Sequence, residues 1–136
     1  MRAYQPRIRP DGYAEWVEHG VTVPVFLEYD TGGEQLPILV DKLYGYRDLF
    51  AKIGRVWPVL FSLHSATRER NLRRLFADEP PVVLVATCAR DMLETGGLCP
   101  ADAVWAAGHG DAGRLRLADL STLTANLRHG SEGEAA

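Results

Sequence analysis

The sequence lacks the features of several protein classes. Among its 136 residues are two cysteines, Cys88 and Cys99, whose spacing matches neither a redox pair nor a zinc-binding pair. The four histidines show no paired metal-site spacing such as HExxH. The longest uninterrupted apolar runs, residues 82–86 and 103–107, are far shorter than the roughly 20 residues that span a bilayer. These absences argue against a zinc enzyme and exclude a transmembrane helix.

The start of the sequence contains no apolar stretch of the kind found in secretory signals. Two isolated cysteines in such a chain are expected to stay reduced, so we expect a cytoplasmic protein that does not associate with membranes. The net charge of −3 is unevenly distributed. Residues 1–76 carry 11 basic and 9 acidic side chains, whereas residues 77–136 carry 4 basic and 9 acidic ones. If a polyanion is bound, we expect the first half to bind it.

Length and composition predict one soluble globular domain. With 46% apolar and 24% charged residues, a chain of 136 residues can bury one core and is too short for two. We assign residues 1–128 to this domain and residues 129–136 to a disordered acidic tail.

Two strand-like runs, residues 13–18 and 21–30, flank the dipeptide His19-Gly20. A short step ending in glycine between two such runs favours a β-hairpin, because both turn residues tolerate a positive φ.

Downstream, helical and strand-like patterns alternate. Apolar residues recur at three- and four-residue steps in the predicted helices, and short apolar runs predict buried strands. In chain order these are a helix over residues 36–53, a strand over 57–63, a helix capped by Thr67, a strand over 82–87, a helix over 89–94 and a strand over 103–107. The pattern predicts an α/β fold with a central mixed β-sheet flanked by helices, in which an antiparallel hairpin joins parallel βαβ strands.

Three acidic residues are predicted to gather at the open end of the hairpin. Counting outward from a two-residue turn places Asp11 opposite Glu28, with Asp30 on the same face. The other face, which ends at Tyr29, is apolar and is expected to cover a core. Because like charges opposed across a ladder are destabilising, a divalent cation such as Mg²⁺ is a plausible counter-charge.

Lys42 and Tyr46 lie one turn apart in the predicted helix and share a stripe that can face these acids. A lysine at such a site adds a fixed positive charge. The alternative is that the acids are solubilising groups and that Lys42 is exposed. Spacing alone leaves both interpretations open.

Three short motifs follow one another in the first part of the chain. They are Arg9-Pro10-Asp11-Gly12-Tyr13, Phe26-Leu27-Glu28-Tyr29-Asp30 and Lys42-Leu43-Tyr44-Gly45-Tyr46. In order and spacing they resemble the actinobacterial plasmid replication-relaxation family, and Val104-Trp105 and residues 115–120 resemble that family's closing segment. The resemblance spans residues 7–120 approximately.

That family is similar in turn to the PD-(D/E)XK nuclease superfamily. The resemblance implies a nuclease-like fold in which Asp11 and Glu28 are the acids of the metal site. If the protein is active, we expect Asp11, Glu28 and Asp30 to hold Mg²⁺ or Mn²⁺. Our candidate catalytic set adds Lys42 and Tyr46, from the following helix, to these three acids. The sequence departs from the nuclease pattern at Asp30, where an active nuclease has lysine, and Lys42 is the candidate for a lysine that has moved to the following helix.

The resemblance implies a DNA-binding or DNA-processing domain linked to plasmid or mobile-element replication, with metal-dependent phosphodiester cleavage if it is active. The alternative is a catalytically inactive nuclease-like module that binds DNA or a protein partner. A third is a remnant reading frame without independent activity.

One helix offers a second candidate surface. Arg68, Arg70, Arg73 and Arg74 surround it and are candidate contacts to DNA phosphates, or simply a solvated face. Family members also carry a winged-helix half before this region, so we expect either such a domain supplied elsewhere or a homodimer.

Overall fold

The computed structural model describes residues 8–107 and 113–124. Their elements are β1 (Gly12–Glu18), β2 (Val21–Tyr29), α1 (Leu36–Ile53), β3 (Val59–Leu63), α2 (Ala66–Asp78), β4 (Val85–Ala89), α3 (Arg90–Gly96), β5 (Ala106–Ala107) and the 3-10 helix η1 (Leu117–Asp119). The predicted tail at residues 129–136 and the domain end at residue 128 lie outside the described residues.

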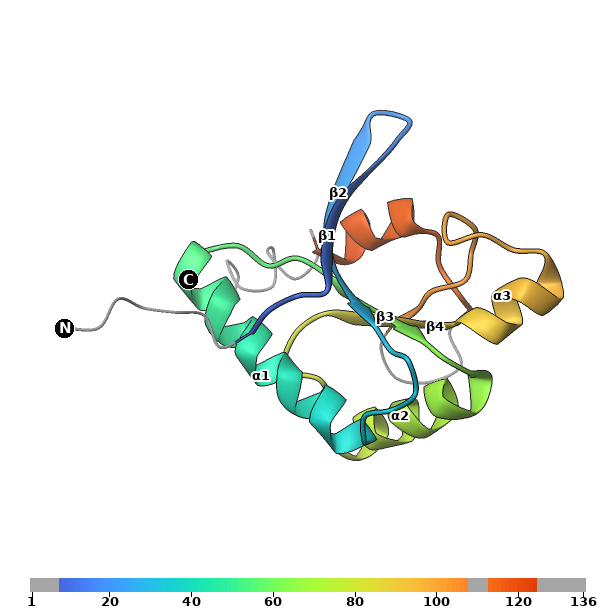
Figure 1. Ribbon diagram of the computed structural model, residues 1–136. Helices are drawn as coiled ribbons and strands as arrows, with labels where there is room; N and C mark the ends of the chain where they lie inside the picture. Colours follow the sequence, from blue (N-terminus) through green and yellow to red (C-terminus); the bar gives the residue numbers. More distant parts are fainter. Residues whose placement is uncertain (1–7, 108–112, 125–136) are drawn as a thin grey trace.

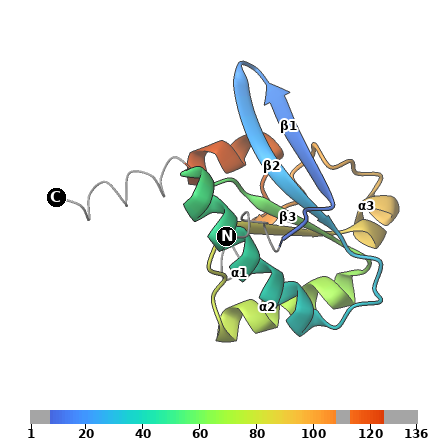
Figure 2. The ribbon, with the colours of Figure 1, turned by 60° about the vertical axis from the view of Figure 1, so that its left-hand side comes forward.

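The described strands form one mixed sheet in the order β1-β2-β3-β4-β5. The pairs β2–β3 and β3–β4 are parallel, whereas β1–β2 and β4–β5 are antiparallel. The predicted fold class, a mixed sheet flanked by helices, is therefore confirmed. Figures 1 and 2 show α1 and α2 together on one side of the sheet, and the tip of the β1–β2 hairpin projecting beyond the rest.

The hairpin has the predicted register. Glu18 pairs with Val21, and Gly12 pairs with Leu27 at the open end. His19 and Gly20 both have a positive φ, of 49° and 78°, which is the geometry of the tight turn whose twist suits a hairpin.

Each face of the sheet buries its own core. On the face covered by α1 and α2, the aromatic side chains of Phe26, Tyr46, Phe50 and Phe61 pack with aliphatic residues. On the other face, Trp105 and aliphatic side chains from β2, β3 and β4 pack against residues around η1, which Figure 1 shows in red. A helix connecting parallel strands must cover a face of the sheet, so these two layers follow from the chain order.

Several boundaries differ from the prediction. The second helix begins after Ser65, whose side chain accepts a hydrogen bond from the backbone N–H of Arg68 at 3.2 Å, so Ser65 and not Thr67 is its cap. The last three strands begin later than their apolar runs, because the first residues of those runs lie outside the ladder pairing. Within the described residues, no helix is both long and apolar enough to cross a membrane.

Candidate functional site

The open end of the hairpin brings Asp11 beside Glu28. The ladder pairs Gly12 with Leu27, so Asp11, one residue earlier, falls opposite Glu28. The Asp11 carboxylate accepts a hydrogen bond from the backbone N–H of Tyr29 at 2.8 Å, which holds it against β2. The pairing of these two acids is the geometry that the turn predicts.

Helix α1 adds a hydroxyl and an ammonium group to this pair. The Tyr46 hydroxyl donates a hydrogen bond to Oε1 of Glu28 at 2.5 Å, and both side chains are buried. Lys42 Nζ lies 3.7 Å from Oε2 of Glu28 and donates a hydrogen bond to Oε1 of Glu34 at 3.0 Å. Asp11, Glu28, Lys42 and Tyr46 therefore meet at one place, as the sequence predicts.

Burial dominates the electrostatics of this cluster. Glu28 is 2% exposed, and burial raises the pKa of its carboxyl group. The negative charge of Asp11 raises the Glu28 pKa further, while the Tyr46 hydrogen bond and the Lys42 charge oppose the shift. Burial also disfavours the charged form of Lys42, but the acids Glu34 and Glu28 hold its pKa above the usual value. The site thus keeps a charged lysine beside a carboxyl group that is costly to ionise.

Asp30 belongs to a different set of contacts. Its carboxylate accepts hydrogen bonds from Nε and Nη2 of Arg68, both at 2.8 Å, and from the backbone N–H groups of His64 and Gly32. Although burial favours its neutral form, these hydrogen bonds lower the pKa of Asp30. Asp30 follows the last residue of β2, and its side chain is directed to α2 rather than to the Asp11–Glu28 pair.

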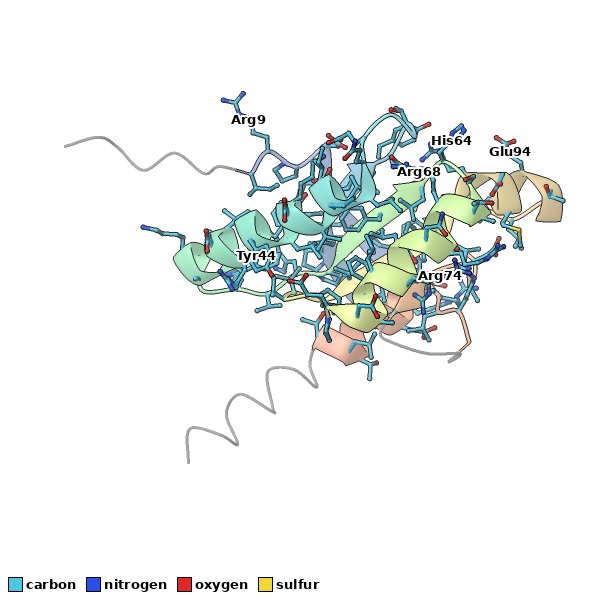
Figure 3. All side chains as sticks on the ribbon, turned by 90° about the horizontal axis from the view of Figure 1, so that it is seen from below. Arg9, Tyr44, His64, Arg68, Arg74 and Glu94 are labelled. Carbon is cyan, nitrogen blue, oxygen red and sulfur yellow. The ribbon has the colours of Figure 1, made fainter. Side chains whose placement is uncertain are left out.

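The four arginines of α2 have separate surroundings. Arg68 is engaged with Asp30, and Arg73 donates a hydrogen bond to the carbonyl oxygen of Ala106 at 3.4 Å. Arg70 and Arg74 are exposed. Figure 3 shows Arg68 at one end of the helix, near His64, and Arg74 further along it. Two of the four predicted phosphate contacts, Arg70 and Arg74, are thus exposed.

Sequence reasoning missed a second buried charge. Glu69 is 3% exposed and binds both Arg114, through two hydrogen bonds of 2.6 and 2.9 Å, and the Thr87 hydroxyl at 2.7 Å. Its spacing could have indicated that Glu69 is buried, because it lies on the same helical stripe as the buried Leu72 and Phe76. Glu34, the partner of Lys42, was also missed, since the loop pattern gives no indication of where its side chain points.

The oxygen atoms of Asp11 and Glu28 suit a hard cation such as Mg²⁺ or Mn²⁺, which takes one or two carboxylates together with water and phosphate oxygens. Across the described ranges, no group of three or more His, Cys, Asp or Glu side chains is arranged to hold a metal ion. The prediction that Asp30 joins Asp11 and Glu28 in one metal-binding group of three acids is therefore wrong, because the Asp30 carboxylate is paired with Arg68.

Comparison with known families bears on this half of the chain. Residues 1–62 match the model of the replication-relaxation family. The match contains β1, β2, α1 and nearly all of β3, and so includes every member of the Asp11–Glu28–Lys42–Tyr46 cluster. The closing segment that resembles the replication-relaxation family at residues 104–120 lies beyond it. No curated protein and no solved structure matches the chain.

Proposed function

We propose that this chain is a nuclease-like domain of the PD-(D/E)XK type that cleaves DNA with Mg²⁺ or Mn²⁺ during plasmid or mobile-element replication. The observation that carries the proposal is the position of Lys42. Its Nζ lies 3.7 Å from the buried carboxylate of Glu28, at the hairpin end where Asp11 also lies. The match to the replication-relaxation family supports the replication context.

Each residue has a defined part in the proposed reaction. Asp11 and Glu28 would hold the cation, and Tyr46 fixes the Glu28 carboxylate through its 2.5 Å hydrogen bond. Bound there, the cation would polarise the phosphodiester and lower the pKa of its water. Lys42 would orient the attacking water and stabilise the negative charge that develops on the phosphate.

The contacts of Asp30 remove one objection to activity. An acid at the usual lysine position would add a third negative charge to a site that must accept a phosphate. Here Arg68 neutralises Asp30 through a two-point ion pair, so that charge is compensated within the fold. The positive charge is supplied from α1 instead.

The proposal predicts that Asp11→Asn slows the Mg²⁺-dependent nicking of supercoiled plasmid by about 100-fold, because it removes an anionic group that holds the cation. Gel electrophoresis of plasmid incubated with each protein measures the rate. Asp41→Asn, which changes an exposed acid of α1, is the matched control and should cleave like the wild type. Equal nicking by wild type and Asp11→Asn would remove the enzymatic function.

A catalytically inactive module that binds DNA or a protein partner is the second candidate. It is favoured by the 3.0 Å hydrogen bond that ties Lys42 to Glu34, which competes with a catalytic role. The partner would be a second copy of the chain or a winged-helix domain. Calorimetric titration distinguishes the two functions, because a module would show no binding of Mg²⁺ or Mn²⁺ at millimolar concentration.

Location is part of the same proposal. Cys88 is buried, Cys99 is exposed, and neither is in a disulfide. Free thiols are typical of a reducing compartment, and a replication role requires access to DNA. We therefore propose that the protein acts in the cytoplasm.

A further inference from the structure

Tyr29 is an exposed aromatic residue at the end of a buried strand. Its side chain is 54% exposed, although Val23 and Val25 on the same face of β2 are in the core. The alternation of the strand predicts a core position for Tyr29. The structure instead leaves a large part of its ring in solvent, at the last residue of β2.

An arginine supports one side of this ring. The guanidinium carbon of Arg90 lies 3.9 Å from the ring centroid of Tyr29, which is cation–π distance. Its Nη1 donates hydrogen bonds to the carbonyl oxygen and the hydroxyl of Ser62, at 2.5 and 3.1 Å, and its Nη2 donates to the carbonyl oxygen of Asp30. Since these contacts hold Arg90 in place, Tyr29 rests on a fixed cationic surface.

The backbone of Tyr29 is next to the proposed cleavage site. The backbone N–H of Tyr29 binds the Asp11 carboxylate at 2.8 Å, and the neighbouring residue in β2 is Glu28. The side chains of Glu28 and Tyr29 point to opposite faces of the strand. The Tyr29 ring therefore lies across β2 from Glu28, and a strand of DNA that reached Asp11 would meet the ring by continuing around the end of β2.

We propose that Tyr29, supported by Arg90, is a stacking platform for an unpaired base of single-stranded DNA. An aromatic ring that is fixed on one side and exposed elsewhere offers a flat surface to a base, and stacking is independent of sequence because every base has a π-face. Both faces of a base within a duplex are already stacked, so the platform selects unpaired DNA. That the ligand is a nucleic acid rests on the proposed function.

The test is the affinity for a fluorescently labelled single-stranded oligonucleotide, measured by anisotropy with the full chain in Ca²⁺ to prevent cleavage. Tyr29→Leu keeps apolar bulk without a flat ring and should weaken binding about tenfold, as expected for one lost stacked base. Tyr29→Phe keeps the ring and should bind like the wild type. Affinity for a duplex of the same sequence should change less than twofold in either variant.

A second tyrosine–arginine pair provides a matched control. Arg47 lies over the ring of Tyr44 at 5.0 Å on α1, and Tyr44→Leu should leave single-strand binding unchanged. Three results would each overturn the platform: an equal loss of single-strand affinity in Tyr44→Leu and Tyr29→Leu, wild-type affinity in Tyr29→Leu, or no single-strand binding by the wild type. Circular dichroism checks that each variant is folded. This test is separate from the test of cleavage. If the wild type does not cleave DNA but Tyr29→Leu alone weakens single-strand binding, the platform is supported and the nuclease function is not. If the wild type cleaves DNA but Tyr29→Leu binds single strands normally, the nuclease function is supported and the platform is not.

Discussion

At the scale of single residues, two acids that are two positions apart have opposite surroundings. Glu28 is buried against a tyrosine hydroxyl, and its pKa is raised, chiefly by burial. Asp30 is also buried, yet hydrogen bonds from Arg68 and two backbone N–H groups lower its pKa. The difference arises because Glu28 faces α1 and Asp30 faces α2. Glu28 is therefore the more suitable of the two for a reactive site, and Asp30 for a structural one.

The structural part of Asp30 can be tested through its partner. Arg68→Met should lower the free energy of unfolding by about 3 kcal/mol, because it leaves a buried carboxylate without its counter-charge. Chemical denaturation at neutral pH measures the change. Arg70→Met, on the exposed side of the same helix, should change stability by less than about 0.5 kcal/mol. Similar losses in both variants would contradict a specific role for the Asp30–Arg68 pair.

The residues that sequence reasoning brings together correctly are those linked by local geometry. Asp11 meets Glu28 because a two-residue turn determines the pairing of the whole hairpin, and Lys42 and Tyr46 share a helical stripe. The Asp30–Arg68 pair joins residues 38 positions apart on different elements, so no periodicity predicts it. Glu69 and Arg114 are likewise 45 positions apart. Such pairs depend on the tertiary packing of segments that are distant in the sequence.

At the scale of elements, the hairpin depends on its turn. Gly20 has a φ of 78°, and a Cβ added there would meet nothing within 4 Å, so only the backbone conformation favours glycine. A left-handed backbone is costly for residues with a side chain. The turn also determines which acids face each other at the open end.

Gly20→Ala should therefore lower the free energy of unfolding by about 1 kcal/mol. The matched control is Gly33→Ala, where φ lies outside the left-handed region and the nearest atom to an added Cβ is 3.9 Å away. Thermal unfolding followed by circular dichroism compares the two. If Gly33→Ala were as destabilising as Gly20→Ala, the turn conformation would not be the cause.

Element boundaries show where patterns become ambiguous. The periodic residues of α1 predict its full range, Leu36–Ile53, because a glycine follows it at the left-handed C-cap. The start of α2 was predicted two residues late, since Ser65 and Thr67 are both suitable caps and only the structure shows which side chain binds a free N–H. Strong local signals at both ends of an element make its range predictable.

At the scale of the whole molecule, both faces of the sheet are covered, and a thiol lies in the core formed with the η1 region. Burial raises the pKa of Cys88 from 9.0 to about 11. Between these two values the unfolded chain loses the thiol proton while the folded chain keeps it. Unfolding then releases a proton, so stability falls as pH rises.

We expect the free energy of unfolding to decrease between pH 9 and 11 with a slope to which Cys88 contributes. Denaturation at several pH values measures this slope, which should be smaller in Cys88→Ala. Cys99→Ser changes an exposed thiol and should leave the slope unchanged. An unaltered slope in Cys88→Ala would show that other groups cause the alkaline loss of stability.

The ion pair between Asp30 and Arg68 has a consequence for transplanting this site. The segment that matches the family ends at residue 62, so it contains the acid but not the arginine that neutralises it. A protein engineer who grafted only that segment onto another scaffold would carry over a buried anion with no counterion. A graft of this segment must therefore include a positively charged side chain at the position that Arg68 occupies near the start of α2.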